Sequence, residues 1–136
     1  MQEKIKIIQV KKLDHKFLYK LLSERNPNAN ISHKKMPSYK QHIEFVSQKP
    51  YSKWYIIFQN NKKVGSVYLS KQDEVGIFVL NKYKNQGIAK EAISLLIKKN
   101  PRHRYLANVS PKNENSKMFF KKMNFKLIQY TYELIT

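Results

Sequence analysis

The sequence predicts a mixed α/β fold, because segments with strand spacing and segments with helix spacing follow one another along its 136 residues. Apolar residues alternate with polar ones in some segments and recur every three or four residues in others. The hydrophobic content of 41% is enough for a core, and no repeat or long linker divides the chain. We therefore expect a single domain over residues 1–136.

The strand predictions rest on alternation of apolar and polar residues and on turn-forming residues between the segments. The Asn60-Asn61 pair between two of these segments suits a tight hairpin. The apolar run that ends at Leu80 is typical of a buried strand, and the last segment is expected to form a strand or a hairpin. The predicted strands cover residues 4–10, 53–59, 63–70, 74–80, 105–109 and 125–134.

The helix predictions rest on apolar stripes and on start and stop signals. Ser38 to Gln41 has the pattern of a capping box, which starts a helix. Asn100-Pro101 would end the third helix, and Asn124 can end the fourth in a left-handed conformation. The predicted helices cover residues 14–25, a segment starting at 38, 88–99 and 113–123, with a loop over 26–37.

The net charge of +18 would attract anions such as nucleic acid, anionic lipid or a polyphosphate. Only 3 of the 27 basic residues are Arg, the residue that nucleic-acid readers favour, and the lysines are spread along the chain. The many Lys and Asn codons also fit a compositional bias of an AT-rich genome. We therefore do not expect nucleic acid as the partner, although a basic nucleic-acid or anion-binding domain without catalysis stays an alternative.

The sequence also excludes several kinds of chemistry. It has no Cys, which rules out disulfides, thiolate metal sites and cysteine nucleophiles. The His residues are not grouped with carboxylates, so we expect no metal. No apolar run approaches the ~20 residues that span a membrane, and the start has no signal-peptide segment. We expect a cytoplasmic protein without membrane contacts.

A glycine-centred loop is the strongest functional signal. Residues 84–89 read Lys-Asn-Gln-Gly-Ile-Ala and lie between a predicted strand and the start of a predicted helix. Lys84 and Lys90 flank this helix start. Because free backbone N–H groups and the positive end of the helix point at such a loop, it is suited to bind phosphate.

A second motif lies about 26 residues further on, where Asn113-Glu114-Asn115-Ser116 starts a predicted helix that ends in Asn124-Phe125. With these two motifs and the order of its elements, the chain resembles the GNAT superfamily of N-acetyltransferases. The family's loop begins with Arg or Gln where this chain has Lys84, which keeps a cation. The resemblance implies a mostly antiparallel central sheet with helices on both faces and splayed middle strands.

The resemblance also implies acetyl-CoA as co-substrate, in a gap between strands 74–80 and 105–109. The backbone of Val79 and Leu80 would pair with the pantetheine arm, Val79 would donate its N–H to the thioester oxygen, and amides 85–90 would bind the pyrophosphate. The implied cofactor-binding residues are Phe78, Val79, Leu80, Lys84, Asn85, Gln86, Gly87, Ile88, Ala89, Lys90, Asn113, Ser116 and Phe120. Phe120 occupies the position at which the family often carries a Tyr that protonates the leaving thiolate.

Acetyl transfer to an amine needs a base, because an alkyl ammonium has a pKa of ~10. Glu74, at the start of the central strand, and His42, on the second helix, are the two candidates. Glu74 could equally belong to a solvated turn, and His42 could be a partly buried residue on an apolar face. His33, Trp54 and Tyr68 are the candidate substrate-binding residues, and aromatic core packing would also explain Trp54.

We expect the acceptor to be a small-molecule amine, preferably an amino sugar or a nucleotide-linked amino sugar, because the helix that carries His42 resembles that of the nucleotide-sugar N-acetyltransferases. Protein or peptide acetylation is the alternative within the family, and a CoA-binding protein that has lost catalysis is a further one. The resemblance also allows a homodimer.

Overall fold

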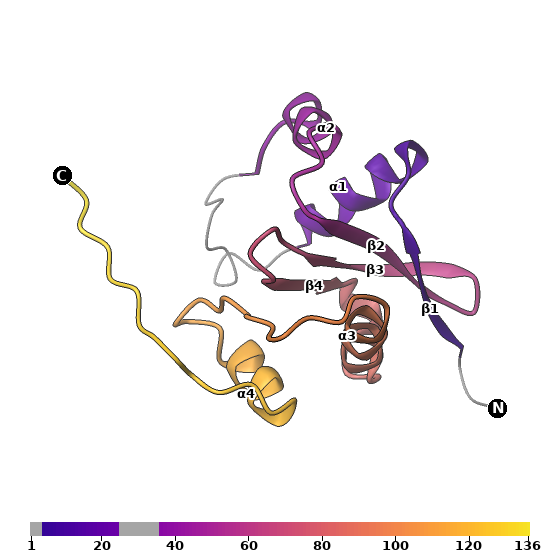
Figure 1. Ribbon diagram of the computed structural model, residues 1–136. Helices are drawn as coiled ribbons and strands as arrows, with labels where there is room; N and C mark the ends of the chain where they lie inside the picture. The colour runs from indigo at the N-terminus through magenta and orange to yellow at the C-terminus, as the bar shows by residue number, and fades with distance from the viewer. Residues whose placement is uncertain (1–3, 25–35) are drawn as a thin grey trace.

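The computed structural model describes residues 4–24 and 36–136. Its centre is an antiparallel sheet in the order β1-β2-β3-β4 (Figure 1). The strands are β1 (Ile5–Gln9), β2 (Lys53–Gln59), β3 (Lys62–Leu69) and β4 (Val75–Val79). Asn60 and Asn61 close the β2–β3 hairpin with φ values of 49° and 69°, which Asn tolerates better than most residues. The predicted hairpin is thereby confirmed.

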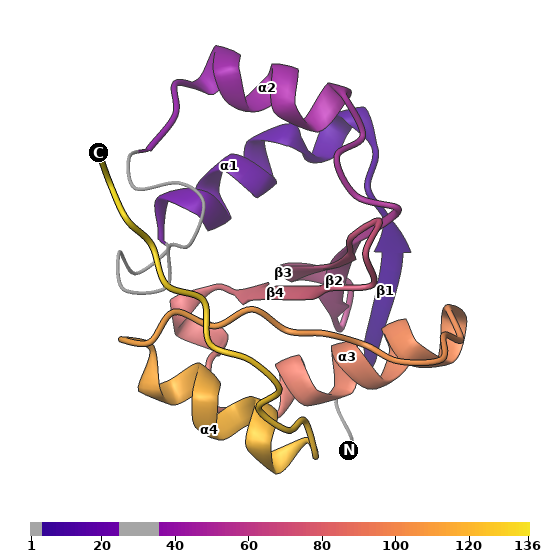
Figure 2. The ribbon, with the colours of Figure 1, turned by 60° about the vertical axis from the view of Figure 1, so that its left-hand side comes forward.

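Helices cover both faces of this sheet, as the second view shows (Figure 2). One face carries α1 (His15–Ser23), which follows the short 3₁₀ helix η1 (Lys12–Asp14), and α2 (Tyr39–Ser47). The other face carries α3 (Ile88–Lys99), which follows η3 (Asn81–Tyr83), and α4 (Glu114–Lys122). The mixed α/β class, the antiparallel sheet and the helices on both faces are as predicted.

Capping explains where α2 starts. The Ser38 hydroxyl accepts from the Gln41 N–H at 3.1 Å, and the Gln41 side chain accepts from the Ser38 N–H at 2.9 Å. This reciprocal pair satisfies two backbone donors that a helix start otherwise leaves without partners, and it confirms the predicted capping box.

Strand alternation sorts apolar side chains into two clusters. Ile57, Val67 and Val75 pack with the apolar stripe of α3 in the larger cluster. Ile56 packs with Leu18 and other residues of α1 and α2 in the smaller one. Neighbouring residues of one strand point to opposite faces, so the same strands build both clusters.

Two predicted strands differ from the structure. Residues 105–109 do not form a full strand: a single parallel bridge joins Leu106 to Glu74. Among the described residues, no further backbone hydrogen bond joins residues 107–109 to β4. Residues 125–134 were predicted as a strand or hairpin, and this prediction is wrong, because no strand in the described part of the chain pairs with them.

Among the described residues, no helix is long and apolar enough to cross a membrane.

Candidate active site

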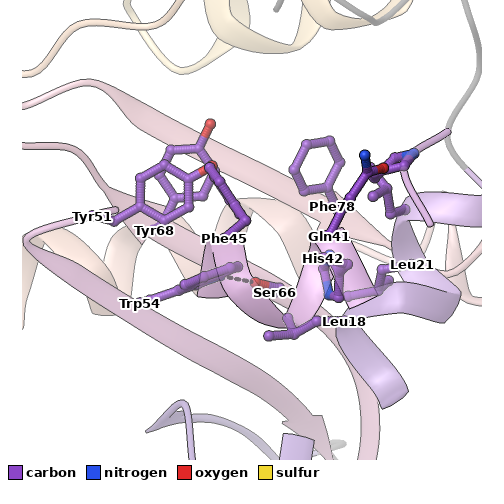
Figure 3. A pocket seen from close by; sticks show the side chains of 12 residues that line it. Leu18, Leu21, Gln41, His42, Phe45, Tyr51, Trp54, Ser66, Tyr68 and Phe78 are labelled. Atoms are coloured by element: carbon purple, nitrogen blue, oxygen red, sulfur yellow. Dashed lines mark hydrogen bonds between the residues drawn. The ribbon is translucent and has the colours of Figure 1, made fainter. Parts of the chain in front are cut away.

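A pocket of about 310 Å³ lies between α1, α2 and the sheet (Figure 3). Its walls are mostly aromatic and aliphatic, and no Asp or Glu is among its described lining residues. The lining residues are Leu18, Leu21, Leu22, Pro37, Gln41, His42, Phe45, Tyr51, Trp54, Ser66, Tyr68 and Phe78. A concave, largely apolar pocket with a few convergent polar groups is the usual form of a small-molecule site.

Hydrogen bonding and stacking fix the aromatic wall. The Trp54 indole N–H donates to the Ser66 hydroxyl at 2.7 Å, which gives both buried polar groups a partner. The rings of Tyr51 and Tyr68 stack with centroids 3.7 Å apart and planes within 3° of parallel. These contacts fix the positions of the Trp54 indole and of the stacked Tyr51–Tyr68 pair beside the cavity.

Gly76 allows the Tyr68 ring to take this place. The two residues are opposite each other on β4 and β3. A Cβ built on Gly76 would lie 1.9 Å from Cζ of Tyr68, far inside contact distance. The ring therefore crosses the β4 backbone because residue 76 has no side chain.

His42 is buried in this pocket wall, with 5% of its surface exposed. Burial lowers its pKa, and the nearby His15 lowers it further, while a hydrogen bond to the backbone of His15 acts in the opposite direction. A bond that raises a histidine pKa is one in which the ring donates. The ring is therefore neutral at pH 7 with one nitrogen donating to His15.

The other ring nitrogen, Nε2, has no hydrogen-bond partner within the described part of the chain. In the neutral ring with Nδ1 protonated, Nε2 carries the lone pair. A buried polar atom without a partner costs about 1–3 kcal/mol, so its presence needs an explanation. A ligand group that donates to Nε2 would supply one.

Glu74 precedes β4 and does not line the pocket. By strand alternation it lies on the same sheet face as Gly76 and Phe78, the face toward α1 and α2. Its carboxylate accepts from the Ser70 hydroxyl at 3.1 Å and from the Asn108 amide. These bonds connect the turn before β4 to the segment after Leu106. Glu74 therefore has a structural role in this part of the fold.

The glycine loop has the geometry of an anion site. Gly87 is the N-cap of α3 in the left-handed conformation, with φ of +79°, and no side chain caps the helix. A Cβ built on Gly87 would meet no atom within 4 Å, so the space in front of the helix start is open. Lys84, Asn85 and Lys90 are exposed around it. Backbone amides and positive side chains thus surround one open space, which fits a pyrophosphate.

Beyond Val75, the outer edge of β4 has no backbone partner among the described residues, so an extended ligand could pair with it. The Leu80 N–H donates to Val64 O at 2.9 Å and the Ser70 N–H donates to Glu74 O at 2.8 Å. Such bonds recur at every second residue of an antiparallel ladder, so the N–H groups of Ile77 and Val79 face away from β3. The Leu80 amide is engaged by β3 and is not available to a cofactor, whereas the Val79 amide points to the open edge.

The residues predicted on the fourth helix have structural contacts of their own. The Asn113 side chain accepts from the Ser116 N–H at 3.1 Å and caps α4. Phe120 is buried in an edge-to-face contact with Phe125, with ring centroids 5.1 Å apart. The position at which the family often carries a Tyr therefore holds a core ring that has no proton to donate.

The structure brings His42, Trp54, Tyr68 and Phe78 together in the pocket, although Phe78 was predicted on the cofactor side. Residues 84–90 form a separate group at the start of α3. His33 lies outside the described residues. Sequence reasoning missed several pocket residues, which only the crossing of α1 and α2 over the sheet brings together. Among the missed residues are Gln41, Phe45, Tyr51 and Ser66. The sequence analysis also missed Gly76, which is not a lining residue but leaves room for the Tyr68 ring.

Comparison with known proteins decides the family. The model of the acetyltransferase (GNAT) family matches residues 16–125. The chain belongs to the GNAT family. It is therefore an acyltransferase that uses acetyl-CoA as acetyl donor. A search of curated protein sequences finds no significant match.

Solved structures share the fold. A domain from Methanocaldococcus jannaschii is 24% identical with a TM-score of 0.83, over 97% of this chain and 94% of that one. An N-acetyltransferase from Staphylococcus aureus is 21% identical with a TM-score of 0.70, over 90% and 84%. The aminoglycoside N-acetyltransferase AAC(6')-Iy in complex with CoA is 17% identical with a TM-score of 0.74, over 100% and 97%.

No group of three or more His, Asp or Glu among the described residues is arranged to hold a metal ion.

Proposed function

We propose that this GNAT enzyme transfers an acetyl group from acetyl-CoA to the primary amine of a small molecule that carries a ring. An amino sugar, and in particular a nucleotide-linked one, is the preferred acceptor. The observation that carries the proposal is the aromatic pocket on one face of β4, with an imidazole nitrogen in its wall that has no hydrogen-bond partner among the described residues. The open edge of the same strand would take the acetyl donor.

The donor side would be held by the loop and by β4. The amides from Asn85 to Lys90 and the side chain of Lys84 would bind the pyrophosphate, and the open space before Gly87 fits such a group. The Val79 N–H would donate to the thioester oxygen as negative charge develops on it. Asn113 and Ser116 would contact the CoA arm from the start of α4.

Charge favours an anionic acceptor over a polycation. The pocket has no carboxylate among its described lining residues, and residues 25–35 contain no Asp or Glu in sequence. The chain carries a net charge of +18. An aminoglycoside with several ammonium groups would find no counter-charge there, whereas the phosphates of a nucleotide-linked sugar would be attracted. The aromatic wall formed by Tyr51, Tyr68 and Trp54 would pack against its rings.

Transfer occurs in one step of a ternary complex. The neutral amine nitrogen attacks the carbonyl carbon, a C–N bond forms and the C–S bond breaks, and the second proton that the nitrogen sheds passes through water to the leaving CoA thiolate. His42 Nε2 takes one proton of the ammonium, directly or through a water. Its lone pair accepts no hydrogen bond from a described residue, and the lowered pKa keeps the ring neutral. Glu74 is the second candidate base. A thiol pKa of ~8.5 makes the thiolate a tolerable leaving group without a Tyr at position 120.

The test is the rate of CoA release with purified protein and a panel of amines. The panel contains a nucleotide-diphosphate-linked amino sugar, the same amino sugar without the nucleotide, kanamycin and a short peptide. We expect kcat/KM to fall in that order, with the linked sugar at least about tenfold above the free one. A higher kcat/KM for the peptide or for kanamycin would contradict the proposed acceptor class.

Two matched variants identify the base. His42→Gln and Glu74→Gln each remove a titrating group and keep a hydrogen-bonding side chain. We expect the His42 variant to lose about 10²–10⁴-fold in kcat, the usual contribution of a general base, and the Glu74 variant to lose much less. The reverse order would assign the base to Glu74.

A further inference from the structure

Ser66 is a polar residue of the pocket floor that the transfer mechanism does not use. Its neighbour on β3, Val67, packs toward α3, so Ser66 points to the opposite face, toward α1 and α2. Only 2% of its surface is exposed. A hydroxyl taken out of water costs free energy unless it is hydrogen-bonded, so the partners of this one need to be accounted for.

The Ser66 hydroxyl uses only part of its hydrogen-bonding capacity inside the protein. Its oxygen accepts from the Trp54 indole N–H at 2.7 Å (Figure 3). A serine hydroxyl also carries a proton, which can rotate toward an acceptor. Among the hydrogen bonds of the described residues, none has Ser66 Oγ as the donor. Because the bond from Trp54 polarises the hydroxyl, its O–H is a stronger donor to a ligand.

Nε2 of His42 is the complementary group in the same cavity. It is an acceptor without a donor among the described residues, whereas Ser66 is a donor without an acceptor. The two line the cavity from different elements, since Ser66 belongs to β3 in the sheet and His42 belongs to α2. A cavity of about 310 Å³ is small enough for one ring-sized ligand to reach both groups.

The charge of the cavity wall limits what Ser66 can bind. Its described lining residues include neither Asp or Glu nor Lys or Arg. A phosphate inside this cavity would be buried without a counter-charge, which is costly, whereas a neutral oxygen such as a hydroxyl needs none. The phosphates of a nucleotide-linked sugar would therefore lie outside the cavity, and the sugar ring inside it.

We propose that Ser66 determines acceptor specificity by donating its O–H to a hydroxyl oxygen on the ring of the acceptor, while the amine of the same ring donates to His42 Nε2. This inference rests on the proposed function, because it takes the acceptor to be a ring that carries an amine. A ring without that hydroxyl would leave a buried donor without an acceptor, so Ser66 selects hydroxylated amines.

Deoxy analogues of the acceptor test the role of Ser66. The probes are the methyl glycoside of glucosamine and the analogues that each lack one of its hydroxyls, assayed by CoA release. We expect at least one analogue to lose about tenfold or more in kcat/KM with the wild type. Trp54→Phe keeps the Ser66 hydroxyl and should keep this loss.

The double variant Ser66→Ala/Trp54→Phe is the matched comparison. It removes the hydroxyl together with its indole partner, so neither buried group is left without a hydrogen bond. We expect this variant to acetylate the parent sugar and the sensitive analogue with equal kcat/KM. A loss of the same size in the double variant, or no sensitive analogue with the wild type, would overturn the proposal.

Trp54 fluorescence gives a readout that does not depend on turnover, because Trp54 is the single tryptophan of the chain and bonds to Ser66. With CoA in place of acetyl-CoA, we expect the parent sugar to change the emission at a concentration at least about tenfold lower than the sensitive analogue. Ser66→Ala should remove this difference. Hydroxyl-dependent binding without acetyl transfer would support the role of Ser66 and contradict the proposed function. Acetyl transfer without dependence on Ser66 would do the reverse, and neither binding nor transfer would contradict both.

Discussion

The two faces of the sheet are built from the same strands but differ in kind. The face toward α3 is closed: Ala92, Ile93 and Leu96 have no exposed surface, and they pack against apolar strand residues. The face toward α1 and α2 keeps a cavity and holds the buried polar residues His42 and Ser66. Since neighbouring residues of a strand point to opposite faces, substitutions at alternate positions should separate stability from acceptor binding.

Truncation of one apolar side chain in the helices on each face should give the largest difference in the free energy of unfolding. Ile93→Ala would open a cavity in the closed core and should cost about 2–5 kcal/mol in the free energy of unfolding, as measured by urea denaturation. Phe45 lines a cavity that already exists. Phe45→Ala should therefore lower the free energy of unfolding by less, and it should raise KM for the acceptor. Equal losses of stability would contradict the contrast between the faces.

Gly76→Ala tests whether the Tyr68 position matters on the pocket face. The new Cβ would overlap the Tyr68 ring, so the ring must move, at a cost of about 1–3 kcal/mol in stability. We expect KM for the acceptor to rise while the Kd of acetyl-CoA, measured by titration calorimetry, stays unchanged. The double variant Gly76→Ala/Tyr68→Ala removes the overlap and should recover the stability. No recovery would place the cause elsewhere.

The pH dependence of His42 should give a smaller effect on stability. Its pKa is lowered by burial, so the folded state resists protonation more than the unfolded state does. The stability that depends on a neutral ring is complete above the ordinary value of 6.5 and declines as pH falls through the lowered pKa. The melting temperature of the wild type should therefore drop more on acidification than that of His42→Gln. Parallel curves of melting temperature against pH for the two proteins would show that burial does not lower the pKa of this ring.

Local sequence signals predicted much of the fold. Three of these signals each depend on a few adjacent residues: the capping box at Ser38–Gln41, the turn at Asn60-Asn61 and the loop around Gly87. The structure contains the capping box, the turn and a helix whose N-cap is Gly87. The segment 125–134 was misassigned because alternation of apolar and polar residues predicts a strand but does not show which strand would pair with it. A strand needs a neighbouring strand, and residues 4–24 and 36–136 contain none that pairs with this segment.

The pocket was harder to predict than the loop. His42, Trp54 and Tyr68 were proposed from residue type, but Gln41, Phe45, Tyr51 and Ser66 reach the same cavity only through the crossing of two helices over the sheet. The role of Gly76 could not be predicted from the sequence, because it depends on the ring opposite it in the β3–β4 register. Long-range pairing of this kind is not encoded in local spacing.

The most direct test of acetyl-CoA binding at the start of α3 is the Kd of acetyl-CoA for the wild type, Gly87→Asp and Gly87→Asn, measured by titration calorimetry. Both substitutions replace a glycine at φ of +79°, a conformation that Asn and Asp tolerate better than other residues, so they differ mainly in charge. We predict that Gly87→Asp weakens acetyl-CoA binding at least about tenfold relative to Gly87→Asn, because a carboxylate would face the pyrophosphate. Equal affinity of the two variants would show that acetyl-CoA does not bind at the start of α3.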